Sequence, residues 1–140
     1  MRTATRISLQ VLKVAGVLQI TLGTLFWIGY AYTLIPVHIV IGSILVLALM
    51  TIGVLAIAAR VRRGLAAFEL VWGLALAAFG VQQAAILIGP LHWIIRVVHL
   101  LMAVVAMQLG SVVAQALLAA VPEFAPTTGR EHDPGAHAAS

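Results

Sequence analysis

Residues 91–121 read LHWIIRVVHLLMAVVAMQLGSVVAQALLAAV, and this stretch decides the fold. It is long enough to cross a bilayer as one helix, because a spanning helix needs about 20 mostly apolar residues. Three similar stretches precede it, at residues 9–30, 36–59 and 64–88. The chain has 140 residues, is 63% hydrophobic and 9% charged, and has a mean hydropathy of +1.13. Nothing of domain size remains outside the four stretches, so the sequence predicts one all-α transmembrane domain over residues 1–121.

The connections between these stretches are very short, which forces consecutive helices to run antiparallel as neighbours. We therefore expect an integral membrane four-helix bundle with up-down-up-down topology. From residue 122 the composition becomes rich in proline, glycine and polar residues. Such a composition cannot bury enough apolar surface to fold. Residues 122–140 are expected to form a disordered cytoplasmic tail, and its His132 and His137 are not expected to be ligands.

The positive charges indicate a membrane topology and not a nucleic-acid partner. Arg60, Arg62 and Arg63 fill the second connection, and Arg2 and Arg6 precede the first span, whereas the first and third connections carry no charge. Positive residues favour the cytoplasmic side. Both termini are therefore predicted to be cytoplasmic, in a bacterial inner (plasma) membrane. The chain has no cysteine, which excludes disulfides and thiolate metal sites.

The two halves of the chain share a weak pattern that suggests a duplication of two helices. Gln19 and Gly23 in the first span correspond to Glu69 and Gly73 in the third, and Pro36-Val37-His38 corresponds to Pro90-Leu91-His92. Two such repeats would have the same orientation and would be related by an axis along the membrane normal. This alignment equates His38 with His92.

Each predicted helix has one face that is richer in small or polar residues. In the fourth span this face carries His92, Arg96 and His99, because positions three or four apart share a helix face. Small residues on a membrane helix mark close packing against another helix or a flat ligand. Similar faces occur in the other three spans, at Gly16, Gln19, Gly23, Phe26 and Tyr30, at His38 and Gly42, and at Glu69, Gly73, Ala77, Gly80 and Gln83.

Two histidines are predicted to lie at the same depth in the membrane. The second span ends at Arg60 and the fourth at Val121, and His38 and His99 precede these two ends by the same number of positions. Neutral imidazoles at equal depth on different helices can ligate one haem iron from opposite sides. We therefore predict one haem b with His38 and His99 as its metal ligands, and His92 as the alternative to His99.

Two further residues would complete this cofactor site. Arg96 lies one turn outward of His99, where its guanidinium would pair with a haem propionate. An ionisable group is rarely tolerated in hydrocarbon without such a role. Gly42, one turn inward of His38, would let the flat macrocycle approach the backbone. The competing interpretation is that all three histidines are neutral polar groups that hydrogen-bond between helices.

Glu69 is the only acidic residue within a predicted span. It lies close in sequence to Arg60, Arg62 and Arg63, so the first expectation is a solvated carboxylate or one paired with these arginines. The alternative is a protonatable group in a proton path, or a contact with another subunit.

The segments Pro36-Val37-His38-Ile39-Val40-Ile41-Gly42 and Arg96-Val97-Val98-His99 resemble the haem-bearing helices of small membrane b-type cytochromes. The broad pattern is similar to cytochrome b561-type proteins, or to one four-helix half of haem A synthase. In those families histidines on separate helices ligate haem, and electrons pass to or from quinone or a partner protein. The chain departs from the two-haem b561 pattern because it has too few helix-borne histidines, and a haem A synthase would have about twice the helices.

The leading hypothesis is a membrane-embedded haem protein that carries electrons between quinone, or an external carrier, and a partner. A catalytic enzyme is the less favoured form of this activity. Candidate partners besides the lipid bilayer are a quinone, a membrane protein or a second copy of the chain. The alternative is a haem-free accessory or structural subunit of a larger membrane complex. A small transporter is disfavoured, because no span carries the interior proline or paired Gly/Pro interruption of a broken helix.

Overall fold

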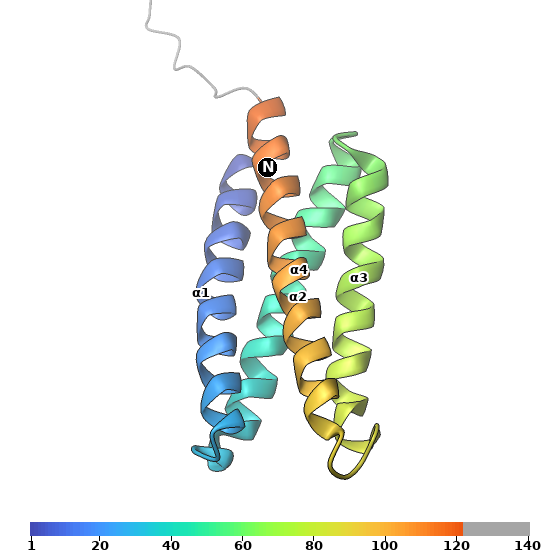
Figure 1. Ribbon diagram of the computed structural model, residues 1–140. Coiled ribbons are helices and arrows are strands. Elements are labelled where there is room, and N and C mark those ends of the chain that lie inside the picture. The colour runs from blue at the N-terminus through green and yellow to red at the C-terminus, as the bar shows by residue number, and fades with distance from the viewer. Residues whose placement is uncertain (122–140) are drawn as a thin grey trace, which may run out of the picture.

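The computed structural model describes residues 1–121 and consists of helices throughout, joined by short connections (Figure 1). The predicted all-α four-helix bundle is confirmed, and no strand occurs in this part of the chain. Its four long helices are α1 (Arg2–Trp27), α2 (Ile35–Ala58), α3 (Arg63–Gln82) and α4 (His92–Ala120). Short 3-10 helices η1 (Tyr32–Leu34) and η2 (Gln83–Ala85) lie before α2 and after α3. The predicted disorder of residues 122–140 lies outside the described residues.

All four helices are long and apolar enough to cross a membrane, so the chain is a multi-pass membrane protein. Consecutive helices pack as neighbours, and α1 also packs against α4, which closes the bundle. Helices α2 and α4 touch each other across the diagonal as well. The up-down-up-down course is visible in Figure 1, where the α1–α2 and α3–α4 connections lie at one end and the N-terminus lies at the other.

The two ends of the bundle differ in charge and in backbone. We call the end that holds Arg2 and the α2–α3 connection, with Arg60 and Arg62, the arginine end, and the opposite end the loop end. At the arginine end the chain turns sharply through Arg60 (φ 60°) and Arg62 (φ 40°). The side chain of Arg2 donates a hydrogen bond to the carbonyl oxygen of Val121 at 2.6 Å, which ties the start of α1 to the end of α4. This tie helps to explain why α1 begins at Arg2 instead of the predicted Leu9.

At the loop end, α3 stops earlier than the hydropathy predicts. The apolar stretch runs to Ile88, but the helix ends at Gln82 and η2 ends at Ala85. The backbone then takes left-handed conformations at Leu87 (φ 52°) and Gly89 (φ 112°). The connection is therefore residues 86–91 and not the dipeptide Gly89-Pro90. Apolar composition does not distinguish the last turns of a helix from a loop that lies at membrane depth.

The hydrophobic core fills only the half of the bundle next to the arginine end. Its buried side chains fall at positions 9–15 of α1, 45–56 of α2, 66–76 of α3 and 106–117 of α4. A hydrogen bond from the indole nitrogen of Trp72 to the carbonyl oxygen of Met102 at 3.0 Å joins α3 to α4. We call the half of the bundle next to the arginine end the packed half. The other half, toward the loop end, is where the bundle is hollow.

Burial reveals a twofold pattern in a register that differs from the predicted one. The spacing of Gly16 and Gly23 in α1 recurs at Gly73 and Gly80 in α3. Buried positions of α2 and α4 also correspond at one constant offset along the chain: Leu45 and Ala106, Leu49 and Gly110, Ile52 and Val113, Gly53 and Ala114, Ala56 and Leu117. At this offset His38 corresponds to His99. The predicted correspondence of His38 with His92 does not follow the burial of the helices.

Candidate functional site at the loop end of the bundle

All five predicted site residues line a single cavity between the four helices. The cavity has a volume of about 800 Å³, and His38, Gly42, His92, Arg96 and His99 all contribute to its wall. Cofactor and small-molecule sites in proteins are usually about 300–1,000 Å³. The space is therefore large enough for a sizeable organic ligand.

Small residues from every helix contribute to the cavity wall. Gly16 and Gly23 of α1, Gly42 of α2, Gly80 of α3 and Ala103 of α4 all line it. A Cβ atom added at Gly23 would meet nothing within 4 Å, so this stretch of wall is open. The packed half closes the inner end of the cavity with Leu45, Leu76 and Met107.

His38 enters the cavity wall from the start of α2. Its imidazole meets the ring of Phe26 edge to face, with centroids 5.3 Å apart and planes at 66°. Its Nδ1 atom is buried and has no hydrogen-bond partner among the described residues. Buried polar atoms are nearly always paired, so an unpaired one calls for an explanation.

His99 enters from α4 in a comparable way. Its imidazole lies nearly parallel to the ring of Phe79, with centroids 6.0 Å apart and planes at 13°. A Cβ atom added at Gly80 would lie 3.1 Å from Cε1 of His99, so the missing side chain of Gly80 makes room for the imidazole. The Nδ1 atom of His99 is also buried without a partner in residues 1–121.

The structure brings these two histidines together across the diagonal of the bundle. Helix α2 ends at Ala58 and α4 ends at Ala120. His38 precedes the end of α2 by almost the same number of residues as His99 precedes the end of α4. The two helices touch, and both imidazoles line the same cavity. The helix bounds therefore place His38 and His99 at a similar depth, as the sequence predicts.

His92 has a different environment, at the first position of α4. Its Nδ1 lies 3.2 Å from the carbonyl oxygen of Ile86, a contact that fastens the α3–α4 connection to the start of α4. A backbone carbonyl bound to one ring nitrogen leaves the other available, as in many ligating histidines. His92 thus has a structural role of its own and remains the alternative to His99.

Arg96 lines the cavity, and its side chain is exposed. No hydrogen bond or ion pair joins it to another residue of the described chain, and Gln82 and Gln83 do not bind it. A guanidinium in this position carries a full charge and five donors. The Arg96 guanidinium is therefore available to bind an anionic group of a ligand in the cavity.

Gly42 is not the open approach to the backbone that the sequence predicts. A Cβ atom at Gly42 would lie 2.5 Å from Nε2 of Gln19, so the side-chain amide of Gln19 already covers the glycine. The Oε1 atom of Gln19 is buried without a partner in this part of the chain. Gln19 is thus a polar group of the site that the sequence does not single out as a ligand contact. Gly23 is the glycine with open space in front of it.

Several supporting residues could be found only from the structure. Phe26 and Phe79 contact the two imidazoles, and Gly80 makes room for His99. The sequence places Phe26 and Gly80 on inward faces but does not say which side chain each one meets. Contacts between helices depend on rotation about the helix axes, which hydropathy does not determine.

Glu69 lies outside the cavity, in the packed half. Its side chain is 0% exposed, and neither carboxyl oxygen has a hydrogen-bond partner among residues 1–121. The expectation that it is solvated or paired with Arg60, Arg62 or Arg63 is therefore wrong. Glu69 lies on the inner face of α3, which turns its side chain away from the bundle surface.

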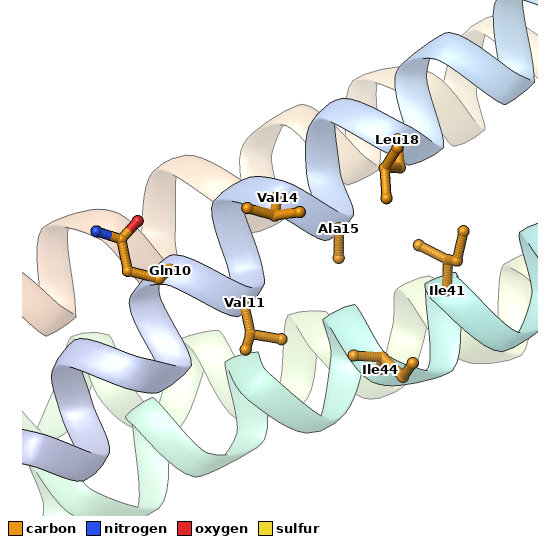
Figure 2. A pocket seen from close by; sticks show the side chains of 7 residues that line it. All are labelled: Gln10, Val11, Val14, Ala15, Leu18, Ile41 and Ile44. Carbon is orange, nitrogen blue, oxygen red and sulfur yellow. The ribbon is translucent and has the colours of Figure 1, made fainter.

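Figure 2 shows a second hollow of about 340 Å³ between α1 and α2. Val11 and Ala15 of α1 face Ile41 and Ile44 of α2 across it. Gln10 is its only polar lining residue, and the Gln10 amide points away from the other side chains of the hollow. It is not a candidate for a cofactor site.

The donors in the large cavity fit some ligands better than others. Within the described residues no group of three or more His, Cys, Asp or Glu side chains could hold a bare metal ion. A haem iron already has four ring nitrogens and needs at most two ligands from the protein. Two imidazoles, a free guanidinium and a largely apolar wall match those needs.

Comparison of the chain with models of protein families, with curated proteins and with solved structures gives no match.

Proposed function

We propose that the cavity at the loop end binds one haem b and that the protein carries electrons across part of the membrane. The observation that carries this proposal is the placement of His38 and His99. They lie at matched depth on touching helices, in the wall of one cavity of about 800 Å³. The resemblance to small membrane b-type cytochromes supports the same assignment.

In this proposal the protein binds the cofactor, and the side chains around the cofactor adjust its reduction potential. His38 and His99 would both hold the haem iron, and two protein ligands favour electron transfer over O₂ binding. Phe26 and Phe79 would hold the two imidazole planes in place. Arg96 would bind a propionate in a charge-assisted hydrogen bond. When bound, haem supplies a one-electron carrier whose potential depends on these neighbours.

The distribution of positive charge supports one orientation in the membrane. The arginine end would face the cytoplasm of a plasma membrane, because positive residues are retained on that side. The cavity would then lie near the outer face, within reach of an external carrier or of quinone in the outer leaflet. A membrane partner protein or a second copy of the chain would receive or supply the electron.

The decisive experiment is absorption spectroscopy of the purified full chain, expressed with an ample haem supply. We expect a Soret band at one haem per chain, and loss of most of it in His38→Ala and in His99→Ala. His92→Ala is the matched control and should keep most of the band. If His92 is essential and His99 is dispensable, the pairing is His38 with His92. If the wild-type protein has no Soret band, the haem proposal fails and the accessory-subunit hypothesis replaces it.

A further inference from the structure

The packed half contains one ionisable side chain that the proposed haem site does not use. Glu69 is the only acidic residue in the described chain, and it is fully buried with both oxygens unpaired. The other three acidic residues of the sequence are Glu123, Glu131 and Asp133, all beyond residue 121.

The carboxyl group lies inside the packed half, close to Gly110 of α4. A Cβ atom added at Gly110 would meet Leu12 of α1, Leu49 of α2 and Oε1 of Glu69, the last at 3.6 Å. The carboxyl group therefore lies near apolar side chains, and neither of its oxygens has a hydrogen-bond partner in the described chain.

No titratable side chain of α1 or α3 compensates the carboxyl group. On α1 the nearest in sequence to Leu12 is Lys13, which is exposed. On α3 itself the nearest is Arg63, at the arginine end.

The other two helices offer no compensating charge either. The titratable residue of α2 is His38, which lies at the loop end, and the titratable residues of α4, His92, Arg96 and His99, lie there too. The polar residues of α4 near Gly110 are Gln108, Ser111 and Gln115, none of which carries a charge; Gln108 and Gln115 are exposed, and Ser111 is half-buried.

An ionised carboxylate in this place would be very unfavourable. Burying an uncompensated charge costs several kcal/mol even after structural relaxation, and a neutral acid avoids most of that cost. The stable form in a bilayer is therefore the protonated acid. The proton on the Glu69 carboxyl group is therefore bound at this site because the apolar surroundings disfavour the ionised form.

The position along the helix determines which side the proton can reach. At a rise of about 1.5 Å per residue, Glu69 lies about 9 Å from Arg63 at the arginine end, about 10 Å from Leu76 at the inner end of the cavity and about 16 Å from Gly80 at the level of His99. Leu76 and Met107, which close the inner end of the cavity, lie between Glu69 and the loop end. The shorter route to water is toward the arginine end.

We propose that Glu69 is a proton-binding site in the membrane interior that exchanges its proton with water at the arginine end. This inference does not rest on the proposed haem, because it needs only the burial of Glu69 and its distance from the two ends.

The test uses the full chain in lipid vesicles and dicyclohexylcarbodiimide, an apolar reagent that attacks protonated carboxyl groups. Mass spectrometry should find one adduct on the peptide that contains Glu69, and none on that peptide in Glu69→Gln. A water-soluble carbodiimide should leave Glu69 unmodified in vesicles and modify it after denaturation. No adduct from the apolar reagent, or rapid modification by the water-soluble one in vesicles, would overturn the proposal.

The side of exchange is tested by changing the pH on one side of the vesicle membrane at a time. The sides are identified by labelling a single cysteine placed at position 61, at the arginine end. Raising the pH on that side should slow formation of the adduct several-fold, and raising it on the other side should leave the rate unchanged. If the rate of adduct formation responds to neither pH change, Glu69 does not exchange its proton with water. If the rate responds only to the pH at the loop end, the proton exchanges on that side and not at the arginine end. Either result sinks the exchange proposal, and neither depends on whether haem binds.

Discussion

At the scale of the residue, two glycines of α3 offer a matched pair of substitutions. A valine side chain at Gly80 would crowd the imidazole of His99, whereas one at Gly64, outside the cavity, would begin at a Cβ atom with nothing within 4 Å. We expect Gly80→Val to displace His99 and to remove most of the bound haem, as measured by the Soret absorbance per chain. Gly64→Val should retain nearly all of it. Equal haem contents in the two variants would show that the position of His99 does not matter for binding.

Arg96 allows a test of charge at the cavity. Arg96→Leu removes the cation proposed to bind a propionate, and charge-assisted hydrogen bonds contribute about 1.5–3 kcal/mol, so haem should bind at least about tenfold more weakly. The midpoint potential of the haem that remains should fall, because a nearby positive charge favours the reduced form. Arg96→Lys keeps the charge and should shift the potential much less. Full haem loading with an unchanged potential in Arg96→Leu would rule out the propionate contact.

Individual residues can be predicted from the sequence where their depth decides the outcome. The sequence places His38, His92, Arg96 and His99 on inward faces, and all four line the cavity. It also predicts an open backbone at Gly42, but Gln19 from another helix covers that glycine. It also puts Glu69 near the arginines in space because the residues are near in sequence. Side-chain direction is set by helix packing, and packing depends on the other three helices.

At the scale of the element, the long helices follow from apolar length and their ends do not. Hydropathy locates all four helices, since a run of about 20 apolar residues has few other stable forms in a bilayer. It misses the start of α1 at Arg2 and the end of α3 at Gln82. Those ends depend on single interactions, such as the bond from Arg2 to Val121 and the left-handed backbone at Leu87.

The tie between α1 and α4 gives a prediction at this scale. Arg2→Ala removes the 2.6 Å hydrogen bond to the carbonyl oxygen of Val121. A partly buried bond from a charged donor contributes about 1.5–3 kcal/mol, so the thermal unfolding midpoint in detergent should fall by several degrees. Arg6→Ala, which removes the same charge at an exposed position of α1, is the control. Similar shifts in both variants would assign the effect to net charge instead of the tie.

At the scale of the whole molecule, the orientation in the membrane can be tested because the chain has no cysteine. Single cysteines at positions 33 and 61 would lie in the α1–α2 and α2–α3 connections. In intact cells an impermeant thiol reagent should label position 33 and should label position 61 only after the cells are opened. Labelling of position 61 from outside would reverse the orientation and would place the cavity at the cytoplasmic face.

The division of the molecule into a packed half and a hollow half bears on how the protein is made. Most side chains that hold the helices together lie away from the cavity, so the newly inserted chain would fold without the cofactor proposed for that space. The apoprotein would then be a durable assembly intermediate that takes up the cofactor late. Variants that fail to load should therefore accumulate in the membrane as folded protein and escape the quality-control proteases that clear unfolded chains.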